Sequence, residues 1–202
     1  MFRHARPLVA ALGLFVASLP ASAAPVSLDA ISAYLNDMTT AQGRFRQYNA
    51  DGSSLDGSLF IKRPGRIRFE YDPPSEALIL AIGGQLAIFD PRSNAGPDRF
   101  PLNQTPLNII LRRNVDLSGE SLVSQVDEID GYTILTVQDA DNPQLGTLQL
   151  YFSDAPVALR QWVVIDEFGN QTTTAISDLI QGRSLGDTMF SIRREMRERG
   201  FE

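Results

Sequence analysis

The sequence contains no cysteine, and its single histidine is His4 among 202 residues. Without cysteine the chain has no disulfide, no thiolate metal site and no cysteine nucleophile. Because His4 lies in an N-terminal segment that we expect to be removed, the rest of the chain has no imidazole. A Ser-His-Asp triad, a histidine zinc site and a histidine general base are then excluded. We therefore expect no enzymatic activity, no cofactor and no bound metal.

Lysine is also scarce, since Lys62 is the only lysine beside 17 arginines. Acidic residues outnumber basic ones by 24 to 18, which gives a net charge of −6. Removing the first 23 residues, whose only charges are Arg3 and Arg6, takes the net charge to −8. Because phosphate contacts need clustered basic side chains, we expect no binding to nucleic acid.

Residues 1–23 have the features of an export signal. Two arginines precede a largely apolar run at 8–19, and small residues at 21–23 fit a cleavage site. Twelve residues are too few to span a bilayer, which needs about 20. We expect cleavage after Ala23, leaving a single domain of residues 24–202 in a bacterial periplasm. No cysteine follows the apolar run, so we expect no lipid anchor.

One amphipathic helix is predicted over residues 27–40. Ser27 is a good N-cap residue for it. Apolar residues recur every three or four positions and form one stripe: Leu28, Ile31, Leu35 and Met38.

Beyond residue 41 the apolar period changes to two, which is typical of β-strands. The clearest strand is 66–72, where Ile67, Phe69 and Tyr71 alternate with four charged residues. Further strands are predicted at 55–62, 78–82, 86–89, 132–137, 147–152, 157–165 and 171–176. Short turns between these strands, such as Gly83-Gly84, predict an antiparallel sheet.

A second helix is predicted at 105–112, in the middle of the strand region. Thr105 as N-cap and Pro106 at the first helical position would start it. Its apolar side consists of Leu107, Ile110 and Leu111. A short amphipathic helix of this kind can cover one mouth or face of a curved sheet.

Two charged segments each have two interpretations. Glu70 and Asp72 lie about 6–7 Å apart on one strand face, as in the carboxylate pair of a glycoside hydrolase. We favour a solvated face beside Arg66 and Arg68. Residues 193–199 hold four arginines and two glutamates, and we favour a solvated, partly helical tail over a membrane-surface or docking role.

Several short motifs occur in a fixed order. Phe45 and Gln47 form F-x-Q, residues 57–64 read G-x-L-x-x-K-R-P, and residues 83–91 fit G-x-x-L-x-x-F-x-P. This ordered set resembles the LolA family of periplasmic lipoprotein carriers over most of residues 27–115. Further along, only the rhythm of strands agrees, and the C-terminal extension departs from the family pattern.

The resemblance implies a mainly β fold with some α: a strongly curved antiparallel sheet, or incomplete β-barrel, closed by a lid of short helices over an apolar cavity. It implies that Arg63, the arginine of K-R-P, latches the closed lid by hydrogen bonds to backbone carbonyls. It places Leu107, Ile110 and Leu111 in the lid helix. The expected cavity-lining residues are Phe45, Leu59, Ile61, Ile67, Phe69, Ile79 and Phe89.

By the same resemblance, the chain is expected to be a soluble, monomeric periplasmic chaperone for the acyl chains of lipoproteins. It would receive them from an inner-membrane ABC-type releasing complex and hand them to an outer-membrane receptor. The alternative is a related half-barrel module, either a receptor or an envelope-stress regulator. A receptor would carry an acylated cysteine, and a regulator would have a second domain.

Overall fold

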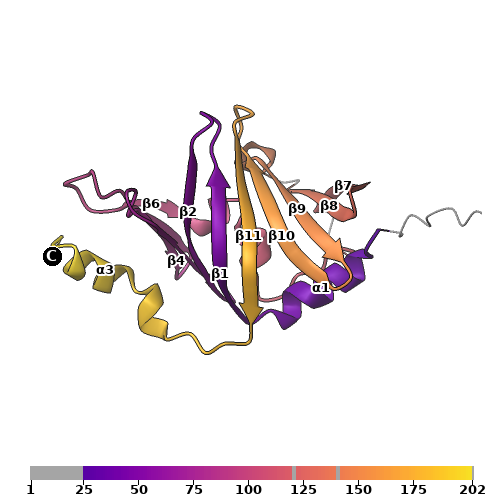
Figure 1. Ribbon diagram of the computed structural model, residues 1–202, viewed down its shortest axis with the longest axis horizontal. Coiled ribbons are helices and arrows are strands. Elements are labelled where there is room, and N and C mark those ends of the chain that lie inside the picture. Colours follow the sequence, from indigo (N-terminus) through magenta and orange to yellow (C-terminus); the bar gives the residue numbers. More distant parts are fainter. Residues whose placement is uncertain (1–24, 120–121, 140–141, 202) are drawn as a thin grey trace, which may run out of the picture.

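The computed structural model describes residues 25–119, 122–139 and 142–201, and the export signal expected at 1–23 lies outside them. These residues form a mainly β structure with a few short helices (Figure 1). The helices are α1 Leu28–Asp37, α2 Asn108–Leu111 and α3 Ile192–Glu198, with 3₁₀ turns at Leu102–Gln104, Pro143–Leu145 and Asp187–Phe190. The strands are β1 Thr40–Tyr48, β2 Ser54–Lys62, β3 Arg66–Tyr71, β4 Leu78–Ile82, β5 Gln85–Phe89, β6 Asp98–Pro101, β7 Val123–Ile129, β8 Tyr132–Gln138, β9 Thr147–Asp154, β10 Val157–Ile165 and β11 Gln171–Gln181.

These strands form one open antiparallel sheet, which confirms the predicted fold class in its main feature. The strand order is β6-β5-β4-β3-β2-β1-β11-β10-β9-β8-β7. The chain runs outward from the centre along β1 to β6, passes through α2, and returns from the opposite edge along β7 to β11. The first and last strands therefore pair with each other, from Ala41 opposite Gln181 to Tyr48 opposite Thr173.

Contacts between the two halves of the sheet reveal its curvature. Phe69 on β3 and Trp162 on β10 are separated by the three strands β2, β1 and β11. In a flat sheet, four steps of about 4.8 Å would place them about 19 Å apart. Their ring centroids are 6.0 Å apart, in an edge-to-face arrangement. The sheet therefore bends around these side chains.

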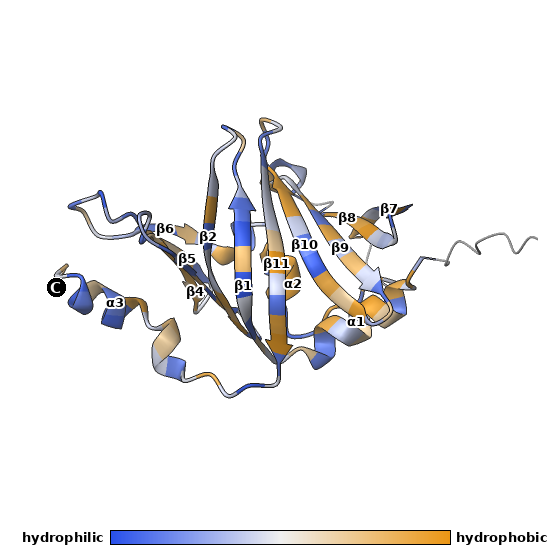
Figure 2. Cartoon of the chain, viewed as in Figure 1, coloured by the Kyte–Doolittle hydropathy of each residue, from blue (hydrophilic) through white to orange (hydrophobic). Residues whose placement is uncertain are grey.

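Different parts of the chain cover the two faces of the sheet. The inner face carries Ile67, Phe69 and Trp162 and packs against α1 and α2. The outer face carries Leu80 and Phe89 and lies beneath the C-terminal segment with α3. Figure 2 shows the alternation of hydrophilic and hydrophobic residues along strands such as β1 and β10. Because successive side chains of a strand point to opposite faces, each strand contributes residues both to the inner and to the outer face of the sheet.

Helix α1 is capped by Ser27 as predicted, whereas α2 is shorter than the helix expected at 105–112. The N-cap of α2 is Leu107, and its side chain makes no capping hydrogen bond. Thr105 does not start the helix, because its Oγ1 donates backward to the Leu102 carbonyl at 2.8 Å. That bond closes the preceding 3₁₀ turn and leaves only one turn of α-helix.

The C-terminal segment is docked on the outer face. The partly helical tail expected at 193–199 is confirmed by α3, and its arginines are exposed. The expectation that it is solvated is wrong for Glu195, which is buried, and for Met196, which packs against the sheet. Ile192, Met196 and Phe201 pack against the cluster formed by Leu78, Ala87 and Phe89. Ile192 and Met196 are four residues apart and therefore lie on one side of α3, and Phe201 follows the helix. This apolar pattern indicates a docked helix, but the many charged residues of the segment favoured a solvated one.

A buried ion pair also holds α3. Arg68 Nη1 lies 2.8 Å from Glu195 Oε1, and the two residues are 9% and 7% exposed. Arg68 also donates to the Met189 carbonyl at 2.8 Å. The charged face of β3, expected to be solvated, is therefore partly an internal surface, because Arg68 lies between the sheet and the C-terminal segment.

Candidate functional site

Arg63 lies in the turn between β2 and β3, and its guanidinium reaches the residues that follow α2. Its Nε and Nη2 donate to the Arg112 carbonyl at 3.1 and 2.5 Å. Nη2 is also 3.5 Å from the Arg113 carbonyl and 3.4 Å from Asn36 Oδ1. Burial lowers the pKa of Arg63 from its ordinary value, but a guanidinium stays protonated in proteins. A single charged fork thus joins the sheet to the end of the short helix.

Two further contacts fix the segment 112–118, which we call the lid strap. Immediately before it, the Gly65 N–H donates to the carbonyl of Leu111, the last residue of α2, at 2.8 Å. Within the lid strap, Val115 is held by Asn36 of α1 through two hydrogen bonds, each 2.9 Å long. The amide of Asn36 donates to the Val115 carbonyl, and its oxygen accepts from the Val115 N–H. The lid strap is therefore bound both to the β2–β3 turn and to α1.

Most of the expected lining residues lie in one core beneath α1 and α2. They are Phe45, Leu59, Ile61, Ile67 and Phe69, and none is more than 4% exposed. Ile110 and Leu111 of α2 are buried in the same core, and Leu107 packs at its border. In this closed arrangement the inner face is filled by its own side chains, so the part of the chain that the structure describes does not confirm an open cavity beneath α2.

Gly57 permits an unusual side-chain arrangement at the centre of this core. The Phe45 ring lies across β2, with ring centroids 5.3 Å from Phe69 and 5.1 Å from Tyr71. A Cβ atom on Gly57 would lie 2.5 Å from the Phe45 ring. Tyr71 also donates to Gln47 Oε1 at 2.6 Å. The F-x-Q motif and the glycine of G-x-L-x-x-K-R-P are thus parts of one contact.

Phe89 is the exception among the expected lining residues. It borders the hollow described next, but its ring is buried on the outer face with Leu78 and Ala87. The Arg199 guanidinium lies over that ring, 5.2 Å from its centroid. The assignment of Phe89 to the inner face is therefore wrong. Its direct neighbour Ile88 has the inward orientation instead, opposite Ile79 in the β4–β5 pair.

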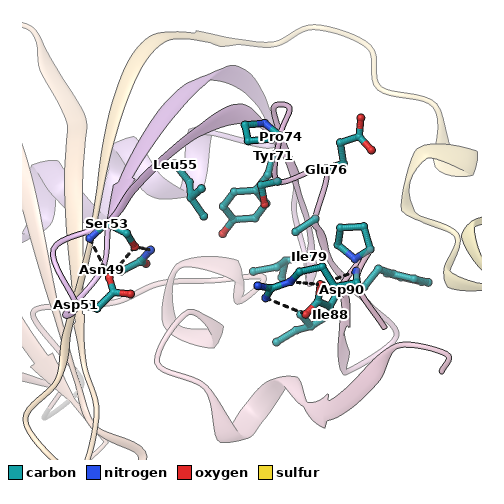
Figure 3. Close-up of a pocket in the computed structure, with 15 residues that line it drawn as sticks. Asn49, Asp51, Ser53, Leu55, Tyr71, Pro74, Glu76, Ile79, Ile88 and Asp90 are labelled. Carbon is teal, nitrogen blue, oxygen red and sulfur yellow. Dashed lines mark hydrogen bonds and ion pairs between the residues drawn. The ribbon is translucent and has the colours of Figure 1, made fainter. Parts of the chain in front are cut away.

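A hollow of about 660 Å³ opens between the β1–β2 hairpin, the β3–β4 turn and the end of β5 (Figure 3). Apolar side chains line part of it: Leu55, Tyr71, Pro74, Ala77, Ile79 and Ile88. Polar and charged side chains line the rest: Asn49, Asp51, Ser53, Ser75, Glu76, Asp90 and Arg92. Leu55, Ala77 and Ile79 also pack against the main core. The hollow is thus a place where the inner-face core is reached from outside.

Tyr71 stands at the junction of the hollow and the core. It is 7% exposed, and burial raises its pKa to about 12. Its ring contacts Phe45, and its hydroxyl is bound to Gln47. Figure 3 shows Tyr71 and Leu55 side by side. The innermost wall of the hollow is therefore aromatic and uncharged at neutral pH.

The two carboxylates considered for glycoside hydrolysis are both bound to arginines. Glu70 accepts from Arg68 Nε at 2.6 Å, and Asp72 accepts from both Nη atoms of Arg44. Both carboxylates therefore belong to ion pairs on the outer face of the sheet. Among the described residues, no group of three or more histidine or acidic side chains could hold a metal ion. No helix in the same residues is long and apolar enough to cross a membrane.

A curved antiparallel sheet with an apolar inner face, covered by short helices and bordered by an open hollow, defines an open half-barrel. The family model described as "Outer membrane lipoprotein carrier protein LolA" matches residues 36–193. The chain belongs to this family.

Two relatives that match over most of their length carry the same description. The outer-membrane lipoprotein carrier protein of Cupriavidus pinatubonensis is 28% identical over 194 residues, covering 90% of this chain and 89% of its own length. The protein of the same description from Pseudomonas aeruginosa is 27% identical over 193 residues, covering 88% of this chain and 91% of its own. A solved LolA superfamily protein from Nitrosomonas europaea has a TM-score of 0.44 at 15% identity, over 82% of this chain and 98% of its own.

Proposed function

We propose that this protein is a soluble periplasmic chaperone that shields the acyl chains of lipoproteins. It receives them from an inner-membrane ABC-type releasing complex and carries them to an outer-membrane receptor. The observation that carries the proposal is the closure of an apolar inner face by a polar contact, in which Arg63 binds the Arg112 carbonyl. The names of the relatives support lipoprotein as the cargo.

The physical demand on such a carrier is moderate affinity. Hiding one CH₂ group from water contributes about 0.8 kcal/mol, so each acyl chain of about 16 carbons contributes on the order of 10 kcal/mol. Two or three chains at full burial would exceed the ceiling of non-covalent affinity, about −20 kcal/mol. Cargo held so tightly would not be released. The cost of opening a closed, self-filled core offsets part of this gain and makes binding reversible.

Arg63 suits the role of a latch. Its bonds to carbonyl oxygens are lost when the lid strap moves away, and water then solvates both partners. The inner-face residues Leu59, Ile61 and Ile67 would line the space that opens, together with Phe45 and Phe69. Leu107, Ile110 and Leu111 of α2 would leave the core with the strap. The hollow at Ile79 would be the point where an acyl chain enters.

The direct test is to purify the protein from periplasm and to identify co-purifying acylated species by mass spectrometry. We expect triacylated or diacylated lipoproteins, and displacement of a bound apolar fluorescent probe by them. Recovery of only non-acylated partners, together with no probe binding, would contradict the carrier function. A regulator would instead keep its cargo when offered the outer-membrane receptor, and a receptor would pass its cargo directly to vesicles, so transfer assayed with the receptor and with vesicles alone separates the alternatives.

The latch is tested with Arg63→Leu. We expect this variant to fold and to bind the apolar probe, but to fail in cycling between closed and open forms, so that delivery of lipoprotein falls. Arg46→Leu is the matched control, because it removes an exposed arginine that is paired with Asp56 far from the lid strap. Normal delivery by Arg63→Leu would refute the latch.

A further inference from the structure

The turn that carries Arg63 is also held from its outer side, by the C-terminal segment. Lys62 Nζ and Arg66 Nη1 each lie 2.7 Å from Asp187 Oδ1. Lys62 Nζ also donates to the Leu185 carbonyl at 2.7 Å. The carboxylate of Asp187 therefore binds one basic side chain on each side of the turn, and one of the two is the only lysine of the sequence.

The arrangement follows from strand register. Lys62 and Arg66 are directly opposite each other in the β2–β3 pair, so their like charges would repel on the same face. Asp187 neutralises part of this charge, and the hydrogen bond and charge of Lys62, with the charge of Arg66, keep the pKa of Asp187 below its usual range. Arg63, next to Lys62 in sequence, reaches the other way to Arg112. The turn is therefore bound on both sides.

Asp187 is itself held by contacts that do not involve the turn. It begins the 3₁₀ turn that ends at Phe190, and Leu185 and Phe190 are buried with Leu80 on the outer face. The buried pair of Arg68 and Glu195 anchors the segment a few residues further on. Losing the Asp187 carboxylate would leave these anchors in place. Its effect on the turn can thus be separated from the docking of the segment.

We propose that Asp187 is a positioning residue for the Arg63 latch: by holding Lys62 and Arg66, it fixes the β2–β3 turn in the orientation that closes the lid strap. The inference rests on the proposed latch function and adds the C-terminal segment as its second half. Because Asp187 is exposed, the effect is modest. Exposed ion pairs of this kind correspond to about a two- to fivefold change in an equilibrium.

The test is amide hydrogen exchange in the full chain with Asp187→Asn. The reporting amides are Gly65, which donates to Leu111, and Val115, which donates to Asn36. We expect both to exchange about two- to fivefold faster, while amides of the β4–β5 ladder are unchanged. Asp187→Glu should restore protection. In 1 M salt the difference between wild type and Asp187→Asn should shrink, because exposed charges are screened.

The matched control is Glu198→Gln, which removes an exposed carboxylate paired with Arg194 in the same segment. It should leave exchange at Gly65 and Val115 as in the wild type. Unchanged exchange at both amides in Asp187→Asn would overturn the proposal. So would an equal acceleration across β4 and β5, since that would mean general destabilisation.

The outcome is distinguishable from a failure of the carrier function. If the wild type binds no acyl probe but the two amides still respond to Asp187→Asn, the positioning role stands and the carrier function fails. If the probe binds and the amides do not respond, the reverse holds.

Discussion

Replacing Gly57 with alanine tests whether the central aromatic cluster is organised as described. Gly57 lies on β2 between Phe45 on β1 and Tyr71 on β3. A Cβ atom there would meet the Glu70 carbonyl at 2.3 Å and two ring atoms of Phe45 at 2.5 Å. Real Cβ atoms do not approach other atoms so closely, so the ring and the backbone of β3 must both move.

The expected cost follows from these two contacts. Forcing an extra methyl group into a packed core costs about 1–3 kcal/mol through strain. Displacing the Phe45 ring also weakens its edge-to-face contacts with Phe69 and Tyr71, each worth about 0.5–1.5 kcal/mol. We therefore expect Gly57→Ala to lower the free energy of unfolding by about 3 kcal/mol.

Urea unfolding followed by the fluorescence of Trp162 provides the measurement. Gly96→Ala is the matched control, because no heavy atom lies within 4 Å of the Cβ position there; its effect should stay within about 0.5 kcal/mol. A double-mutant cycle with Phe45→Ala isolates the ring. In the Phe45→Ala background the alanine at position 57 should cost about 1–2 kcal/mol less, with the clash against Glu70 remaining.

Two results would refute this reasoning. A Gly57→Ala protein as stable as Gly96→Ala would mean that the ring does not cross β2. Strict additivity in the cycle would mean that the glycine is needed for another reason, such as the close backbone of β3.

The remaining predictions concern the outer face, the junction and the hollow. Glu195→Ala should lower the free energy of unfolding by about 2 kcal/mol in urea titrations, because Arg68 loses its buried partner and keeps only Glu70 and the Met189 carbonyl; replacing Glu195 and Arg68 together by methionine and leucine should cost less. Burial raises the pKa of Tyr71 from its ordinary value of 10 to about 12. Its contribution to the free energy of unfolding is therefore constant below pH 10 and is lost as the pH rises from 10 toward 12, at up to about 1.4 kcal/mol per pH unit. Tyr71→Phe should flatten the stability curve between pH 10 and 11, and an unchanged slope would contradict the burial. Ile79→Asn should weaken binding of an apolar probe about tenfold in fluorescence titrations, since it removes about 1–2 kcal/mol of apolar contact; equal affinity would exclude the hollow as the entry point.

The strands were predictable because one face of most of them is clearly more polar than the other. β4 and β10 match the predicted bounds, and the Gly83-Gly84 turn joins β4 to β5 with positive φ at both residues. β6 was not predicted because it is only four residues long, and β7 because most of its residues are exposed. β1 was not predicted as a strand either, because only Ala41 and Phe45 of its residues are buried. None of these strands has the apolar alternation that identifies a half-buried strand.

The error at Phe89 has a physical cause in the same patterning. On β4 and β5 both faces are apolar, because the outer face lies beneath α3 and the inner face belongs to the core. Where no alternation exists, sequence alone does not determine which face a residue takes. The ion pairs of Asp187 and Glu195 escaped prediction for another reason. Their partners on β2 and β3 are distant in sequence, and each charge considered alone resembles a solvated one.

Arg63 was predictable only through the family resemblance, since an arginine before a proline in a turn is ordinarily exposed. Its partner is a main-chain carbonyl just after α2. The amino-acid sequence does not indicate where a main-chain carbonyl will lie in space. The position of Gly57, by contrast, has a reason that the motif alone did not reveal: the Phe45 ring on the neighbouring strand β1 needs its space.

The pairing of β1 with β11 has a consequence for how the chain acquires its structure. The central seam of the sheet joins residues far apart in the sequence, such as Ala41 and Gln181, so it cannot form until nearly the whole chain is available. Loop closure over such a separation is slow, and sheets rich in non-local pairs fold in milliseconds to seconds. Until then the inner-face side chains are exposed to water on two separate meanders. The apolar inner face is therefore the surface most prone to aggregation during folding, and the last strand to form is the one that joins the two meanders and buries it.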